Sequence, residues 1–175
     1  EWYLTHLCSR PDVASGCLLG RESALQRLEW HNGWPRLAGG GRFARTVWPA
    51  PAGLPAFAPA APPDRDDFDA PAFAPGYAVP RAPLGAALAL TARPGWLRLY
   101  GAQSLESRFT QSLLAARQQH FNCRVETRID FDPVDYHHTA GLVYYYDNNS
   151  HYYLALTRDE RLGRVLTLMR RRLKQ

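Results

Sequence analysis

The chain has 175 residues, of which 46% are apolar and 21% are charged, so it holds enough material for one ordinary domain or two small ones. Its apolar runs are far shorter than the roughly 18 residues that a membrane-spanning helix needs, and its mean hydropathy is −0.37. Most of the net charge of +5 comes from a cluster close to the C-terminus, namely Arg170, Arg171, Arg172 and Lys174. Disorder, a membrane span and a nucleic-acid-binding face are therefore not indicated.

The N-terminal block carries short strand-like segments over residues 2–7, 25–30 and 34–37, with a tight turn around Asn32 and Gly33. The first residues already have the pattern of a strand interior and no Met precedes them, so we expect the chain to begin inside a longer protein. A block of about 45 residues is too small to close a core of its own.

A Pro- and Ala-rich stretch follows this block. Residues 49–63 hold six prolines and six alanines, a composition that removes backbone donors and offers little to bury. We therefore place a linker over 46–63, between an N-terminal part, 1–45, and a C-terminal domain, 64–175. Four further prolines up to Pro83 predict that the chain runs irregularly before regular structure begins.

The C-terminal domain has the pattern of an antiparallel sandwich. Strands are predicted over 87–91, 96–100, 108–117, 121–131, 141–147, 151–157 and 164–169. Alternation is strict from Cys123 to Phe131, which predicts one buried and one wet face. Asp147 to Ser150 has the chemistry of a tight hairpin turn because Asn tolerates a positive φ. Residues 104–119 also have some helical spacing, but a long strand is favoured.

The polar residues give little sign of a catalytic or metal centre. Glycoside hydrolysis needs two carboxyl groups on either side of the scissile bond, and the sequence offers pairs close along the chain, such as Asp66 with Asp67, Asp130 with Asp132, and Asp159 with Glu160. Neighbours in a strand point to opposite faces, so solvated charge is the favoured interpretation of each pair. Three histidines, His137, His138 and His151, have no metal-ligand spacing, and the three cysteines indicate neither a zinc site nor a disulfide framework.

Two features could bind a ligand. Five tyrosines gather on the predicted hairpin, where aromatic rings could stack on sugars, although alternate packing into the core is the favoured interpretation; they are Tyr144, Tyr145, Tyr146, Tyr152 and Tyr153. Arg21 follows Gly20 at the start of a predicted strand, where its planar guanidinium could hold hydroxyl groups or a carboxylate. A surface pair of Arg21 with Glu22 is the alternative.

Taken together, these segments resemble glycoside hydrolase family 43 β-xylosidases. In the N-terminal part the likeness lies in residues 2–11, 17–30 and 33–37, with Leu19-Gly20-Arg21-Glu22 at the centre. It continues after the linker in residues 66–68, 93–101, 107–109, 117–121, 140–146 and 152–154. The resemblance implies an all-β chain: the last strands of a five-bladed catalytic propeller followed by a concanavalin A-like sandwich, truncated at both ends.

The same resemblance implies a function for the whole protein. The β-xylosidases of this family cleave xylo-oligosaccharides with inversion, using an Asp base, a Glu acid and a second Asp. The resemblance places these three residues before Glu1, so no catalytic residue is expected in this chain. Arg21 occupies the position that lines the substrate pocket. The sandwich is expected to cap the active site and support a homo-oligomer. No cofactor or metal is assigned to this chain, although some propellers of the family hold calcium, and a cytoplasmic location is expected.

Alternatives remain open at this point. The parent could be an α-L-arabinofuranosidase, because the family contains both activities. The sandwich could instead be a non-catalytic carbohydrate-binding module, which the five tyrosines suggest, or a purely structural domain.

Overall fold

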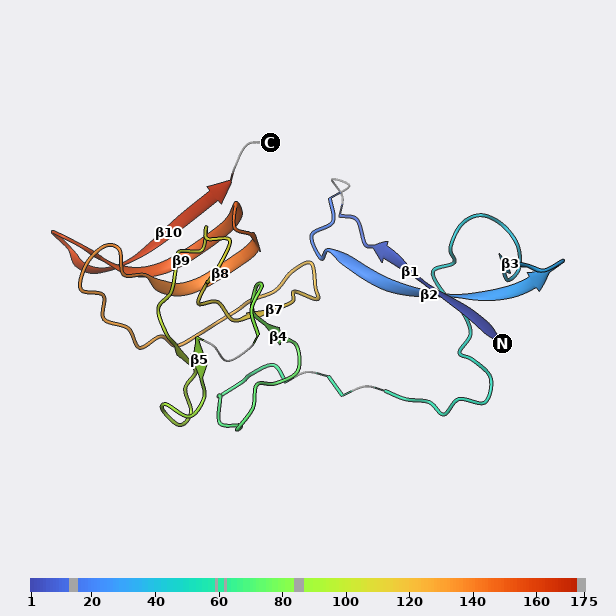
Figure 1. Cartoon of the computed structure of the whole chain (residues 1–175), viewed down its shortest axis with the longest axis horizontal. Coiled ribbons are helices and arrows are strands. Elements are labelled where there is room, and N and C mark those ends of the chain that lie inside the picture. Colours follow the sequence, from blue (N-terminus) through green and yellow to red (C-terminus); the bar gives the residue numbers. More distant parts are fainter. Residues whose placement is uncertain (13–15, 59, 62, 84–86, 173–175) are drawn as a thin grey trace. The chain divides into compact units, whose positions relative to one another are not determined.

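The computed structural model describes residues 1–12, 16–58, 60–61, 63–83 and 87–172, and within these ranges it contains ten β-strands and no helix (Figure 1). The described part of the chain therefore has no helix that is long and apolar enough to cross a membrane. The chain divides into two compact units. The first unit comprises Glu1–Asp64 with Gln118–Cys123, and the second comprises Arg65–Arg117 with Arg124–Gln175.

The first unit is built on an antiparallel sheet of β1 (Trp2–Ser9), β2 (Arg21–His31) and β3 (Trp34–Leu37) in the order β1-β2-β3. These strands confirm the three N-terminal strands expected from the sequence. Asn32 and Gly33 connect β2 to β3 with φ angles of 48° and 79°. Both central residues of a two-residue hairpin of this kind need a positive φ, which explains why Asn-Gly stands there.

The segment after β3 returns to the sheet through the side chain of Gln26, which is only 2% exposed. Its Oε1 accepts hydrogen bonds from the Arg45 amide at 2.9 Å and from Trp48 Nε1 at 2.8 Å, and its Nε2 donates to the Arg45 carbonyl at 2.9 Å. The Arg45 guanidinium lies over the Trp48 ring at 4.8 Å. The beginning of the region expected to be a linker is therefore bound to β2, and no strand forms in the described residues from 46 to 63.

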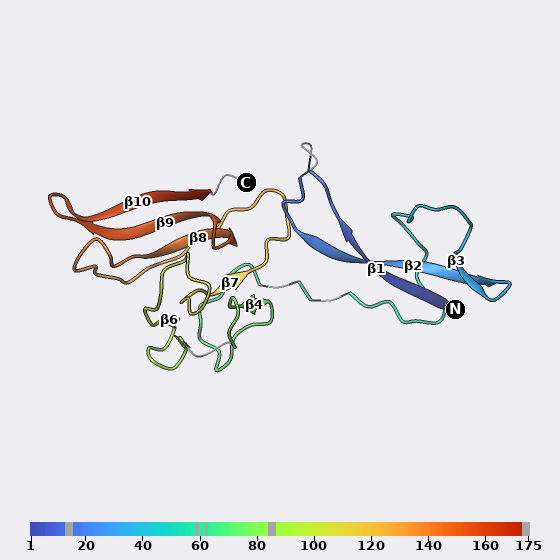
Figure 2. The ribbon, with the colours of Figure 1, turned by 45° about the horizontal axis from the view of Figure 1, so that its top comes forward.

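The second unit contains a sheet of three long strands, β8 (Ala140–Asp147), β9 (Ser150–Asp159) and β10 (Gly163–Arg172), in the order β10-β9-β8 (Figure 2). They confirm the last three expected strands. The expected hairpin turn is also present, but neither Asn148 nor Asn149 has a positive φ. Instead, Asp147 Oδ1 accepts a hydrogen bond from the Asn149 amide at 2.8 Å and closes the turn from its side chain.

The other strands of the second unit are much shorter than expected. Two-residue ladders join β4 (Tyr77–Ala78) to β7 (Ala115–Ala116), and β5 (Leu88–Ala89) to β6 (Arg98–Leu99). The expected strands over 87–91, 96–100 and 108–117 thus shrink to two residues each. The helix considered for 104–119 does not form.

The expected strand over 121–131 is absent, and the predicted buried face with it. Cys123 to Asp130 are all exposed, and the described residues supply no partner strand for them. An alternating pattern becomes a strand only when a neighbour satisfies its backbone groups and covers its apolar face, and both are missing for this segment.

Few large apolar side chains are buried in the described residues. The apolar residues buried most deeply are Leu19, Ala38, Leu88, Leu113, Pro133 and Ala155. One face of the β8–β10 sheet leaves Leu154, Leu166 and Leu168 at 40%, 63% and 68% exposure. The register places Leu168 beside Leu154 and Leu166 beside Leu156, so these side chains form a continuous apolar row across the strands.

Candidate functional site

Arg21 is placed by the turn that precedes β2. Gly20 has a φ of 73°, which favours glycine, and its amide donates to the Cys17 carbonyl at 3.1 Å. The Cys17 thiol donates to the Gly20 carbonyl at 2.8 Å, and Leu19 is 4% exposed. This fixed turn delivers Arg21 as the first residue of β2, opposite Ser9, with its side chain exposed.

Glu22 projects from the other face of the sheet, because successive strand residues alternate. Its carboxylate accepts two hydrogen bonds from Arg10, from Nε at 2.7 Å and from Nη2 at 2.8 Å. The hydrogen bond to Glu22 also raises the pKa of Arg10. The sequence left a surface pair of Arg21 with Glu22 open, and in the structure the Glu22 carboxylate forms a two-pronged pair with Arg10.

Sequence reasoning gave Arg10 no role. Its signal is visible only once the register is known, because that register brings the end of β1 beside the start of β2. Ser9 then pairs with Arg21 and Cys8 with Glu22, which leaves Arg10 within reach of the Glu22 carboxylate.

Three of the carboxylates singled out from the sequence have lowered pKa values. The pKa of Asp67 is lowered by its hydrogen bond from Arg65, and that of Asp130 by its hydrogen bond from Arg93. The pKa of Asp159 is lowered by the backbone amides of Leu162 and Arg161. A general acid needs the opposite, a carboxyl group whose pKa is raised so that it keeps its proton near neutral pH.

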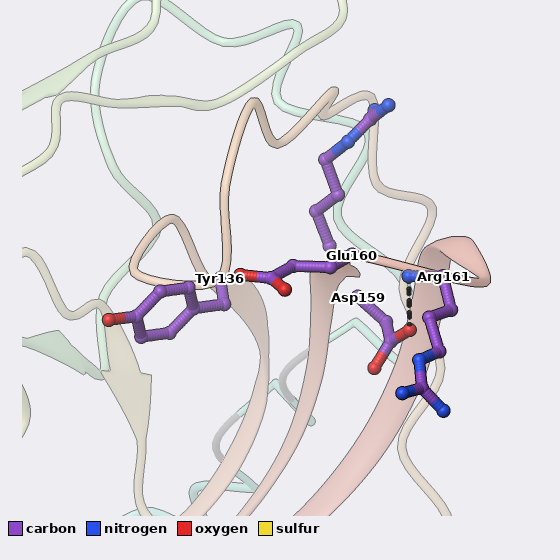
Figure 3. Close-up of a pocket in the computed structure, with 5 residues that line it drawn as sticks. Tyr136, Asp159, Glu160 and Arg161 are labelled. Carbon is purple, nitrogen blue, oxygen red and sulfur yellow. Dashed lines mark hydrogen bonds between the residues drawn. The ribbon is translucent and has the colours of Figure 1, made fainter.

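A hollow of about 410 Å³ lies beside the turn between β9 and β10 (Figure 3). Its lining consists of Tyr136, Arg158, Asp159, Glu160 and Arg161. In Figure 3 the Glu160 carboxylate points toward Tyr136, while Asp159 Oδ1 accepts the Arg161 amide at 2.8 Å. Asp159 therefore serves the turn, and Arg21 does not line this hollow.

Two of the three histidines lie beside one carboxylate, and the third lies apart from them. His137 Nδ1 and His138 Nε2 lie 3.6 and 4.0 Å from the Asp135 carboxylate, while His151 is buried elsewhere, stacked on Tyr145 with ring centroids 5.9 Å apart. Among the described residues, no group of three or more His, Cys, Asp or Glu side chains could hold a metal ion.

The tyrosines divide between the two faces of the sheet, as the favoured interpretation expected. The ring of Tyr145 packs inward, with its hydroxyl 3.4 Å from Gln111 Nε2, and burial raises the pKa of Tyr153. The exposed side chains are Tyr144, Tyr146 and Tyr152, at 47%, 77% and 45%. Tyr144 and Tyr152 are register partners, and the Arg170 guanidinium lies 5.6 Å from the Tyr152 ring centroid.

A second aromatic group is covered by cations. The guanidinium carbons of Arg93 and Arg128 lie 4.1 and 5.3 Å from the ring centroid of the half-buried Trp96. Arg93 also donates to Asp130 Oδ2 at 2.5 Å. These cations compete with a sugar for the indole, so Trp96 is a poor candidate for sugar stacking.

Comparison with known proteins defines the class. Residues 65–175 match the family model for the β-xylosidase C-terminal concanavalin A-like domain of glycoside hydrolase family 43. The chain belongs to this family.

Relatives extend the likeness over nearly the whole chain. A putative β-xylosidase of Escherichia coli is 43% identical over 97% of this chain and 34% of its own length, and a xylan 1,3-β-xylosidase of Vibrio is 38% identical over 97% and 34%. An α-L-arabinofuranosidase of Bacteroides ovatus is 32% identical over 99% and 32%. The crystal structure of a xylan β-1,4-xylosidase from Bacillus halodurans superposes with a TM-score of 0.91 at 42% identity, over 97% of this chain and 33% of that one. The chain thus spans about a third of the length of these relatives.

Proposed function

We propose that this chain is a C-terminal part of a β-xylosidase that hydrolyses xylo-oligosaccharides. The observation that carries the proposal is the 43% identity to a putative β-xylosidase over 97% of the chain, together with the matching fold of a xylosidase at a TM-score of 0.91. The arabinofuranosidase relative, at 32% identity, makes arabinofuranoside hydrolysis the alternative activity.

In this proposal β1, β2 and β3 are strands of the catalytic propeller, and the second unit is the accessory sandwich. The exposed apolar row on β8–β10 supports a longer protein, because soluble proteins rarely leave such a surface uncovered. A homo-oligomer and a cytoplasmic location also stay predictions.

Arg21 is the residue proposed to contact substrate. Its side chain is exposed at the start of β2, and five donors in one plane can bridge adjacent sugar hydroxyls in a way that an ammonium cannot. In the full-length enzyme, Arg21→Lys should lower kcat/KM roughly 10- to 150-fold, as expected for a lost charge-assisted contact of roughly 1.5–3 kcal/mol.

The melting temperature should change little in this variant, because Arg21 is exposed. A matched control is Arg27→Lys, an exposed arginine further along β2. Arg27→Lys should leave kcat/KM within about twofold of the wild type. If Arg21→Lys does the same, Arg21 does not bind substrate.

The 175-residue chain by itself should not hydrolyse p-nitrophenyl β-xyloside. Inversion needs two carboxyl groups about 6.5–9.5 Å apart, one of them with a raised pKa, whereas Asp67, Asp130 and Asp159 all have lowered pKa values. Turnover that disappears in an Asp130→Asn variant would contradict this prediction.

Carbohydrate binding by the sandwich is the second candidate, and the exposed Tyr144 and Tyr146 favour it. Titration of the chain with xylohexaose should then release heat that is lost in a Tyr144→Ala, Tyr146→Ala double variant. Trp96 fluorescence should stay constant, because two guanidinium groups cover its ring. A flat titration of the wild-type chain would leave the sandwich a structural role.

A further inference from the structure

Gln118–Cys123 belongs to the first unit although both flanking segments belong to the second. The chain leaves the second unit after Arg117 and returns to it at Arg124, so these six residues are an excursion of the C-terminal domain's chain. Arg10, which directly follows β1 and lies beside the start of β2, contacts the excursion.

Arg10 contacts the excursion in two ways. Its Nη2 donates to the Gln119 carbonyl at 3.4 Å, a long hydrogen bond, and its guanidinium carbon lies 5.9 Å from the ring centroid of Phe121. The same Nη2 donates to Glu22 Oε1 at 2.8 Å, and Nε donates to Glu22 Oε2 at 2.7 Å. Glu22 thus fixes the plane of the guanidinium. The orientation of this plane determines how Nη2 faces the Gln119 carbonyl and how the guanidinium faces the Phe121 ring.

Hydrogen bonds within the excursion also stabilise its conformation. Gln118 Nε2 donates to the His120 carbonyl at 2.6 Å and, at 3.4 Å, to the Phe121 carbonyl. Phe121 is 41% exposed, so its ring is only partly covered. A short loop of this kind, without a strand partner in the described residues, needs an external contact to stay on β1 and β2.

We infer that Arg10 is the positioning residue of an intramolecular anchor, which fastens Gln118–Cys123 of the C-terminal domain's chain to the ends of β1 and β2. Glu22 orients the guanidinium, and the guanidinium holds the excursion through the Gln119 carbonyl and the Phe121 ring. The anchor is independent of the hydrolase function proposed above, since neither residue needs to contact substrate.

The competing explanation is an ordinary surface ion pair. The side chains of Arg10 and Glu22 are 53% and 31% exposed, and exposed pairs often contribute nothing measurable to stability. That explanation predicts no local effect on the excursion. Hydrogen–deuterium exchange of the backbone amides separates the two, because it reports local opening residue by residue.

The test compares variants of the 175-residue chain by exchange at neutral pH. Arg10→Gln should accelerate exchange of the amides of 119–123 roughly tenfold, while amides in the middle of β2 stay within twofold of the wild type. Arg10→Lys should show most of this effect, because an ammonium cannot hold Glu22 with two prongs and reach Gln119 as well. Arg124→Gln is the matched control, since Arg124 directly follows the excursion and pairs with Glu126 at the surface.

Two further measurements keep the test decisive. Glu22→Gln should release the same amides without touching Arg10 itself, and 1 M salt should do so in the wild-type chain by screening the pair. The inference is overturned if Arg10→Gln leaves 119–123 within twofold of the wild type, if it accelerates β2 equally, or if Arg124→Gln has the same effect.

Discussion

Gln26 offers a sharp test of how the first unit is held together. Its amide is buried at 2% exposure and makes three hydrogen bonds, to the Arg45 amide, the Arg45 carbonyl and Trp48 Nε1. Gln26→Glu keeps the shape but replaces the donor that faces the Arg45 carbonyl, 2.9 Å away, with an oxygen. One hydrogen bond is lost, two acceptors meet, and a carboxylate is buried.

The expected cost is roughly 2–4 kcal/mol, which combines the lost hydrogen bond with the penalty for an unsatisfied buried polar group. Urea unfolding of the chain, followed by the Trp48 indole resonance in NMR spectra, measures this cost where the contact lies. The resonance should also shift in the folded state, because Trp48 Nε1 donates to the substituted side chain.

The matched control is Gln103→Glu. Gln103 is exposed and accepts a hydrogen bond from the Ser107 hydroxyl, which a carboxylate accepts equally well. We expect a change below about 0.5 kcal/mol there. If Gln26→Glu and Gln103→Glu cost the same within about 0.5 kcal/mol, the buried amide does not hold the segment after β3.

The second unit yields two further predictions. Gly141→Ala should abolish cooperative unfolding of the β8–β10 sheet in a thermal melt or destabilise it by more than about 3 kcal/mol, because a Cβ at Gly141 would overlap the Leu154 carbonyl. Gly101→Ala, which has open space around it, should be nearly neutral in the same melt. Arg93 lowers the pKa of Asp130, so the stability that this pair contributes is present above the unfolded-state pKa of about 4 and is lost as pH falls through the folded-state pKa. In the Asp130→Asn variant, stability should therefore decrease less steeply below about pH 4. An acid titration that is unchanged in this variant would contradict the pair's role.

The sequence predicts well those strands that find partners within the described residues. Alternation and turn chemistry located β8, β9 and β10, because each of these strands pairs with the next along the chain and needs nothing distant. The same alternation over 123–131 led to a wrong prediction, since the pattern records what a strand would bury and not whether a partner is present.

The site shows the same limit. The position of Arg21 followed from a glycine at the mouth of a strand, which is local information, and its role in binding stays a prediction. Arg10 and Gln26 were missed because their partners are set by strand register or lie in another segment: Glu22 and Gln119 for Arg10, and Arg45 for Gln26. A polar residue acquires its meaning from these neighbours, and no spacing along the chain encodes them.

The excursion of Gln118–Cys123 has a consequence for anyone who would divide this protein by cloning. The family boundary at residue 65 looks like a natural place to cut, yet a product that starts there keeps Phe121 and loses Arg10. Its exposed aromatic ring and unanchored loop would be artefacts of the cut.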